Sequence, residues 1–137
     1  MHAELRKKYH AENSQQNSGT SLGEVDLSGF APGEATPWGI LAVKAPEAWA
    51  LSDGGAQARV LVLDTGIDKN HTSLKSNFEK GRNFFESDAG PNPEDYADGE
   101  GHGTHCSGTI AGSLNAESGF AGVAPNAKLL MGRVCGS

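Results

Sequence analysis

Apolar residues after position 58 gather into short runs that glycine-rich turns separate. The run at 59–63 (RVLVL) is continuous and rich in β-branched residues, with Gly54 and Gly55 before it and Asp64, Thr65 and Gly66 after it. Such a run predicts a strand that is buried on both faces of a parallel sheet. Two similar runs, at 81–85 and 127–134, predict two further strands.

Two stretches carry helical patterns. In residues 44–51, Pro46 suits a first helical turn, and Ala48, Trp49 and Leu51 offer a short apolar face. Residues 103–114 place apolar side chains four positions apart on one side of a helix, with glycines that allow close packing; these side chains are Cys106, Ile110 and Leu114. Strands that alternate with helices predict an α/β fold in which helices flank a parallel sheet.

The polar segments indicate the domain organisation. Residues 10–35 are rich in Ser, Asn, Gln and Gly, so we interpret 1–35 as a flexible linker or the remnant of a pro-segment, and 36–137 as the folded part. Residues 86–101 are acidic and rich in Pro and Gly, which predicts a surface loop.

Charge and composition exclude several classes of protein. The net charge of −6, with scattered Lys and Arg, argues against a nucleic-acid-binding surface. No run approaches the roughly 18 apolar residues of a membrane span, and residues 1–10 lack the apolar core of a secretory signal. Two cysteines leave the redox compartment undecided: Cys106 and Cys135 could pair with each other, stay free or pair elsewhere.

Asp64 and His102 are the candidate chemical groups. Asp64 ends a predicted strand, and ligands of open parallel sheets gather at the carboxyl ends of the strands. Its carboxylate could orient an imidazole, bind a metal or simply cap a turn. His102 stands between two glycines in GHGTH, which leaves its ring accessible. It could act as a general base, have a purely structural role, or bind zinc together with His105. The Glu of the zinc-binding H-E-x-x-H motif is missing, which argues against zinc.

The surrounding residues resemble one family. LDTGID at 63–68 is similar to the aspartate motif of the subtilases, and GHGTHCSGTIAG at 101–112 to their histidine motif. TPWGI at 36–40 resembles the start of the mature enzyme, and KAP at 44–46 and GVAP at 122–125 resemble neighbouring family segments. Residues 36–137 are thus similar to the N-terminal part of a subtilisin-like catalytic domain, within the thiol-containing branch of proteinase K and thermitase. This implies a three-layer α/β fold.

The resemblance also implies an activity. It is that of a serine endopeptidase that hydrolyses peptide bonds with a Ser-His-Asp triad, in which Asp64 orients and stabilises the imidazole and His102 acts as general base. The family's serine lies far downstream in a G-T-S-M-A-x-P motif, after an oxyanion-hole Asn, and neither occurs in these 137 residues. GTSLG at 19–23 matches only three of those residues and precedes Asp64, so we reject Ser21 as nucleophile.

We therefore expect this segment to be inactive alone and to need the remainder of the catalytic domain. The alternative is a non-catalytic, truncated subtilase-like interaction module. Its strand at 127–134 would then lack a neighbour on one side. The resemblance further implies a protein or peptide substrate, a pro-segment inhibitor as a further partner, and secretion, with neither nucleic acid nor membrane involved.

Two further features concern the family's calcium site and a free thiol near the catalytic histidine. No cofactor is required, and the usual calcium ligand positions hold Ser73 and Ala116, which removes two oxygen ligands. Asn115 and Glu117, or the acidic loop, could still hold a weaker calcium ion, but a solvated loop is the preferred explanation of the acids. That loop carries Asp88, Glu94, Asp95, Asp98 and Glu100. Cys106 occupies the position of a free thiol beneath the catalytic histidine, where we expect a buried core residue.

Overall fold

The computed structural model describes residues 36–85, 92–114 and 120–136. The predicted linker at 1–35, Ser21 and the calcium candidates Asn115 and Glu117 lie outside these residues, as do Ala116 and Asp88. The elements in chain order are α2 (Trp38–Ala42), α3 (Ala45–Ser52), the 3₁₀ turn η2 (Asp53–Gly55), β1 (Arg59–Asp64), β2 (Phe78–Asn83), α4 (His102–Ala111) and β3 (Lys128–Arg133).

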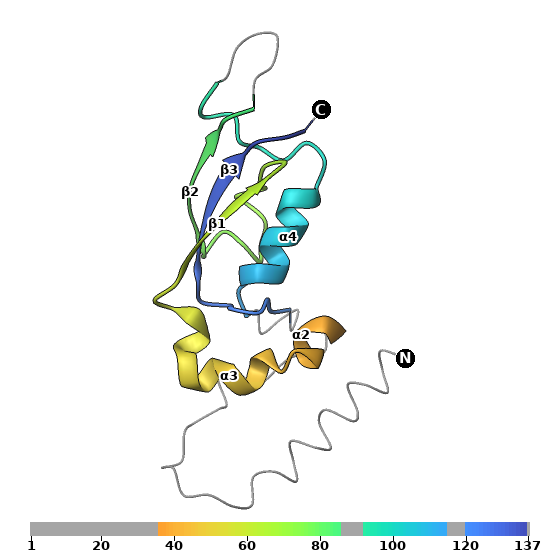
Figure 1. Cartoon of the computed structure of the whole chain (residues 1–137), viewed down its shortest axis with the longest axis vertical. Helices are drawn as coiled ribbons and strands as arrows, with labels where there is room; N and C mark the ends of the chain where they lie inside the picture. The colour runs from red at the N-terminus through yellow and green to blue at the C-terminus, as the bar shows by residue number, and fades with distance from the viewer. Residues whose placement is uncertain (1–35, 86–91, 115–119, 137) are drawn as a thin grey trace, which may run out of the picture.

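The three strands form a parallel sheet in the order β1-β3-β2. β3 is therefore the central strand, with Met131 opposite Val62 and Arg133 opposite Asp64. The expectation that residues 127–134 would lack a neighbour on one side was wrong, because β3 pairs with both other strands. Figure 1 shows β3 between β1 and β2, with all three strands running in the same direction.

Helix α4 lies against one face of this sheet, with its first residues at the carboxyl ends of the strands (Figure 1). Val62, Leu129 and Met131 are at most 7% exposed and form the core with residues of the loops and of α4. The side of α4 that is buried carries small residues, Gly103, Ser107, Gly108 and Ala111. This corrects the predicted stripe of Cys106, Ile110 and Leu114: small side chains allow the helix to approach the sheet closely, and Leu114 lies beyond the helix end.

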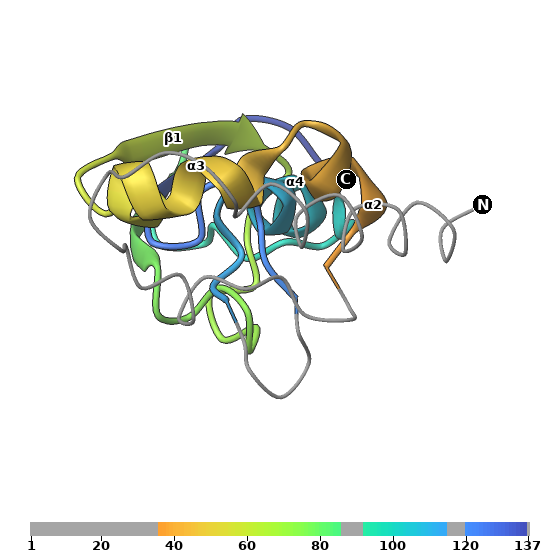
Figure 2. The ribbon, with the colours of Figure 1, turned by 90° about the horizontal axis from the view of Figure 1, so that it is seen from below.

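The other face of β1 is open. Leu61 and Leu63 are each 58% exposed, so the prediction of a strand buried on both faces was wrong for this side. Figure 2 shows the reason, since α4 lies on one side of β1 and none of the helices in the described ranges covers the opposite side.

A second cluster joins α2 and α3 to the rest of the molecule at the end of the sheet where β1 begins (Figure 1). Its centre is Trp49, which is 1% exposed and donates its indole N–H to the carbonyl oxygen of Val123 at 2.8 Å. Ile40 and Ala45 pack beside it. Leu51, predicted to share the apolar face, is instead 85% exposed, because it points away from this cluster.

Two element boundaries differ from the predictions. β2 spans Phe78–Asn83 rather than 81–85, because Phe78 already pairs with β3 and a register irregularity follows at Lys80. Helix α4 begins at His102 and ends at Ala111, three residues before the predicted end. None of the helices in the described ranges combines the length and apolar character needed to cross a membrane.

Candidate active site

Asp64 is fixed at the carboxyl end of the sheet. It is the last residue of β1, and its carbonyl oxygen accepts a hydrogen bond of 2.9 Å from the backbone N–H of Val134. Its side chain is 13% exposed, and Oδ1 accepts a hydrogen bond of 2.7 Å from the N–H of Thr65. The carboxylate is therefore held in one orientation, facing the start of α4.

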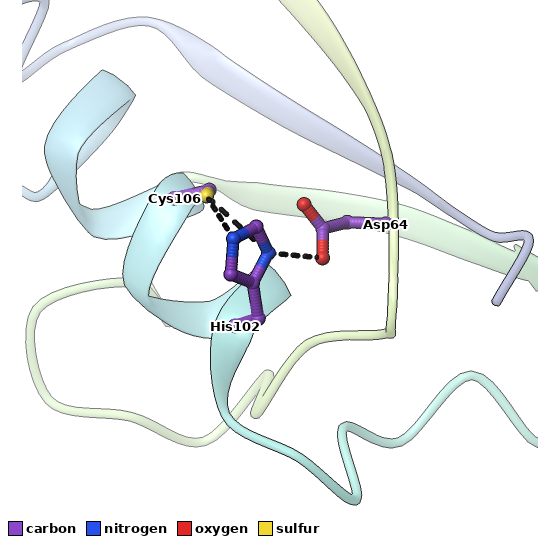
Figure 3. Close-up of side chains that lie close together, drawn as sticks. All are labelled: Asp64, His102 and Cys106. Atoms are coloured by element: carbon purple, nitrogen blue, oxygen red, sulfur yellow. Dashed lines mark hydrogen bonds and ion pairs between the residues drawn. The ribbon is translucent and has the colours of Figure 1, made fainter. Parts of the chain in front are cut away.

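His102 is the first residue of α4, and its ring lies beside that carboxylate. The helix follows Gly101, whose φ of 87° lies in the left-handed region that glycine adopts without strain. Nδ1 of His102 lies 2.8 Å from Oδ1 of Asp64 (Figure 3). The expectation that these groups, 38 positions apart, become hydrogen-bonded neighbours is confirmed. Since an ionised carboxylate only accepts, Nδ1 carries the proton.

The pair shifts both pKa values in the directions that favour charge. The hydrogen bond that His102 donates to Asp64, followed by the negative charge of Asp64, raises the pKa of His102. For Asp64, burial raises the pKa, but the hydrogen bonds from His102 and the Thr65 N–H outweigh it and leave the pKa below its ordinary value. The imidazole ring is 70% exposed, so Nε2 is accessible from solvent.

Two glycines bring the loop after β1 against α4. Gly66 has a φ of 123°, and a side chain there would meet the carbonyl oxygens of Tyr96 and Ala97. At Gly103, an added Cβ would overlap the carbonyl oxygen of Gly66 and lie 3.2 Å from Cβ of Asp64. The short distance between Asp64 and His102 therefore depends on the absence of a side chain at position 103.

Asp98 is a site residue whose role the sequence did not reveal. We expected it in a solvated loop or a weak calcium site, but it is partly buried and its carboxylate accepts hydrogen bonds from Thr65, Gly101 and Thr104. Burial raises its pKa, yet the hydrogen bonds from the side chain and backbone of Thr104 and from Gly101 lower the pKa far more. An Asp three residues before a glycine at a helix start is a local turn pattern that could have indicated this role.

Cys106 lies next to the histidine, as predicted, but it is only partly buried rather than a core residue. Its Sγ is 3.7 Å from Nδ1 and 3.9 Å from Nε2 of His102 (Figure 3). Burial, followed by the charge of Asp64, raises the pKa of the thiol, so it is neutral near pH 7. Cys106 and Cys135 are both free, which excludes a bond between them here.

The arrangement does not favour a metal ion. Donor atoms of Asp64, His102 and Cys106 lie within 4.8 Å of one another. Two tetrahedral ligands at roughly 2.0–2.1 Å from a zinc ion lie about 3.4 Å apart. Nδ1 of His102 and Oδ1 of Asp64 are only 2.8 Å apart, at the distance of a direct hydrogen bond, so these two atoms are not spaced to share one such ion. His105 lines a separate hollow of about 850 Å³ between α2 and α4, which His102 does not line.

Ser73, which the family resemblance places at a calcium-ligand position, has its carbonyl oxygen engaged in hydrogen bonds. Ser73 is 7% exposed, and its carbonyl oxygen accepts hydrogen bonds from the N–H and the hydroxyl of Ser113, at 2.8 and 3.1 Å. Calcium prefers six to eight oxygen ligands, with carboxylates among them. A serine whose carbonyl is already engaged contributes little to such a site.

Comparisons with known proteins agree with this geometry. Residues 55–137 match the subtilase family, Peptidase_S8. The chain is 46% identical over 100 residues to the major intracellular serine protease of Bacillus subtilis (strain 168), covering 73% of this chain and 31% of that protein. It is 37% identical over 97 residues to thermitase of Thermoactinomyces vulgaris, covering 71% of this chain and 33% of that protein.

A solved structure gives the same result. The nisin leader peptidase NisP from Lactococcus lactis superimposes with a TM-score of 0.58 and 28% identity, over 66% of this chain and 27% of that one. The chain thus spans no more than about a third of the length of these relatives. From the match over residues 55–137 and the 46% identity to a curated serine protease, the chain belongs to the subtilase family of serine peptidases.

Proposed function

We propose that this chain supplies the aspartate and the histidine of the Ser-His-Asp triad of a serine endopeptidase. The observation that supports the proposal is the hydrogen bond of 2.8 Å between Nδ1 of His102 and Oδ1 of Asp64, beside a ring that is 70% exposed. A largely buried carboxylate on one nitrogen of a histidine whose side chain is otherwise exposed is the arrangement that a general base requires.

The chemistry follows from the tautomer. With the proton on Nδ1, Nε2 has a free lone pair that takes the proton of a serine hydroxyl as its oxygen attacks the peptide carbonyl. The ring becomes an imidazolium, which Asp64 stabilises, and Nε2 then returns the proton to the leaving amine. The raised pKa of His102 increases its strength as a base in this step.

The nucleophile has to come from elsewhere in the catalytic domain. The 137 residues contain no G-T-S-M-A motif, and Ser107, on the same helix as His102, is fully buried. We therefore propose that the chain is inactive until the remainder of the domain provides the serine and the oxyanion hole. A peptide substrate bound in extended form is the substrate class that this chemistry serves.

A chimera tests the proposal. Residues 36–137 replace the matching segment of the B. subtilis major intracellular serine protease, and the product is called the joined enzyme below. We expect it to hydrolyse a peptide substrate and to react with a fluorophosphonate probe. Asp64→Asn should lower kcat roughly 10⁴-fold, and His102→Ala by at least as much.

The chain alone provides the control. It should remain unlabelled by the probe and show no hydrolysis above buffer. Labelling of any serine in the isolated chain, or an unchanged kcat in the His102→Ala joined enzyme, contradicts the proposal and leaves the non-catalytic module as the better interpretation.

Three finer predictions stay as predictions. A weak calcium site at Asn115 and Glu117 and inhibition by a pro-segment both concern residues outside the described ranges. Secretion is the third, and one of the similar proteins is by its name an intracellular protease.

A further inference from the structure

We propose that Asp98 is a positioning residue that fixes the distance and angle between Asp64 and His102. The proposal rests on the proposed function, because it assigns Asp98 an effect on that same pair. Asp98 has no hydrogen bond to either catalytic side chain; it accepts hydrogen bonds from Thr65, which follows Asp64, and from Gly101, which precedes His102.

On the strand side, the link is Thr65, the residue after Asp64. Its hydroxyl donates to Oδ1 of Asp98 at 2.9 Å and accepts the backbone N–H of Gly103, the residue after His102, at 3.0 Å. One hydroxyl therefore joins the Asp98 carboxylate, the loop after β1 and the first turn of α4.

On the helix side, the link is Thr104. Its backbone N–H and its hydroxyl both donate to Oδ2 of Asp98, at 2.8 and 2.5 Å. The same hydroxyl accepts the N–H of Asp68 at 3.0 Å, which attaches the helix to the loop after β1 a second time. Oδ1 also accepts the N–H groups of Gly101, at 2.8 Å, and Glu100, at 3.1 Å, so the turn before His102 has one shape.

Only a carboxylate satisfies this set of neighbours. Each of the five groups around it donates, and three of them are backbone N–H groups that cannot reverse their polarity. An asparagine has only one oxygen that accepts. Its NH₂ group would take the place of either Oδ1 or Oδ2, and in both orientations it would face at least one backbone N–H that also donates. Asp98→Asn is therefore a nearly isosteric change that must break one half of the arrangement.

The consequence for the catalytic pair is a loss of alignment. A hydrogen bond weakens steeply as its angle and length depart from the optimum, and proton transfer depends on a near-ideal position of the base. If the first turn of α4 is released from Thr65, the ring of His102 can move away from Asp64 without any change to either catalytic side chain.

The test compares two acids of the same loop in the joined enzyme. Asp98→Asn and Glu100→Gln each remove one negative charge that raises the pKa of His102, so they change the charge near the ring alike. We expect Asp98→Asn to lower kcat at least ~30-fold with little change in KM, and Glu100→Gln to change kcat less than ~3-fold. Thr104→Val should lower kcat in part, and Thr104→Ser should restore it.

A double-mutant cycle separates positioning from general destabilisation. If Asp98 acts through the pair, Asp98→Asn causes little further loss once Asp64→Asn is present, whereas independent effects multiply. Proton NMR of the 137-residue chain gives a second readout that needs no activity: the Nδ1 proton of His102 should be far downfield in the unchanged chain and in Glu100→Gln, and should broaden or shift upfield in Asp98→Asn.

The outcomes are distinguishable. Equal effects of Asp98→Asn and Glu100→Gln on kcat and on the Nδ1 proton overturn the positioning role. The role is also overturned if the loss of kcat in the Asp98→Asn, Asp64→Asn double variant equals the product of the two single losses. If instead Asp64→Asn and His102→Ala leave kcat unchanged, it is the proposed function that fails. Should Asp98→Asn not fold, as judged by circular dichroism, the comparison of Thr104→Val with Thr104→Ser decides, and equal kcat values for that pair reject the proposal.

Discussion

Asn77 holds together three segments that support the site. It is 5% exposed and lies just before β2, where its side-chain amide donates to the carbonyl oxygen of Ala111 at 2.9 Å and to that of Pro125 at 2.6 Å. Ala111 is the last residue of α4, where helix carbonyls lack partners within the helix. The backbone oxygen of Asn77 accepts the N–H of Leu129 in β3 at 2.8 Å. One buried side chain thus joins α4 to the segment before β3.

Replacement by alanine removes both donors at once. Each hydrogen bond contributes about 1 kcal/mol net, and the loss of a donor leaves a buried acceptor unpaired at a further cost. Together with the small cavity left behind, we expect Asn77→Ala to lower the free energy of unfolding by ~2–4 kcal/mol. Against the 5–15 kcal/mol that is typical of a whole domain, this is a large fraction.

Asn77→Asp keeps the shape of the side chain but replaces the amide donor with a carboxylate that only accepts hydrogen bonds. Its ionised carboxylate would face two carbonyl oxygens and donate to neither, so burial and repulsion raise its folded-state pKa above the unfolded value of about 3.9. For an acid with a raised folded-state pKa, the destabilisation is complete at high pH and shrinks as the pH falls through that pKa, because the protonated acid can donate one bond. Asn77→Asp should therefore be more destabilising at pH 8 than at pH 5, relative to Asn77→Ala.

Urea denaturation of the joined enzyme, followed by tryptophan fluorescence, measures both effects. His102→Ala serves as the background to prevent self-cleavage, and Asn70→Ala, at an exposed position, is the control, for which we expect a change within ~0.5 kcal/mol. A loss below ~0.5 kcal/mol for Asn77→Ala, or a pH-independent difference between the two Asn77 variants, refutes the reasoning.

Three further predictions concern the site. Gly103→Ala should lower stability by ~1–3 kcal/mol in thermal denaturation, because the added Cβ overlaps the carbonyl oxygen of Gly66. This loss should appear even though alanine favours a helix over glycine by about 1 kcal/mol. The control is Gly39→Ala in α2, where nothing lies within 4 Å of the added Cβ and only a gain in stability is expected. The acid limb of the kcat/KM profile should lie above the ordinary histidine pKa, since His102 acts deprotonated, and should move to lower pH in Asp64→Asn; an unmoved limb contradicts the pairing. In a Cys135→Ser background, which removes the exposed free thiol, alkylation by iodoacetamide should be slow at pH 7 and accelerate above the ordinary thiol pKa. Adding Cys106→Ser should abolish the reaction, and rapid reaction of Cys106 at pH 7 disproves a neutral thiol.

The sequence predicted the parts of this molecule whose pattern is local. A continuous apolar run marks the strand at 59–64, and the helix predicted from residue 103 begins at His102. The proximity of Asp64 to His102 is not a local feature and was expected from the resemblance of two motifs to those of the subtilases. The three-strand parallel sheet with helices beside it also agrees with the prediction and with the solved relatives.

What was missed depends on contacts between distant segments. The exposure of Leu61 and Leu63 depends on what covers one face of the sheet, which the run of apolar residues alone does not reveal. The central position of β3 follows from pairing across more than 40 residues, and the sequence of a strand does not name its neighbours. Asp98 looked like any acid of a polar loop, because its donors, Thr65 and Thr104, lie on two other segments.

The order of the strands has a consequence for how the chain matures during synthesis. β1 and β2 do not touch each other through backbone bonds; each is completed by β3, which is made some 65 and 45 residues later, counted from the strand bounds. While the ribosome is still adding the intervening residues, both earlier strands have their backbone groups open. The carboxylate of Asp64 therefore takes its final position only after Arg133, its partner in β3, has been synthesised, and the pair with His102 cannot align before that point.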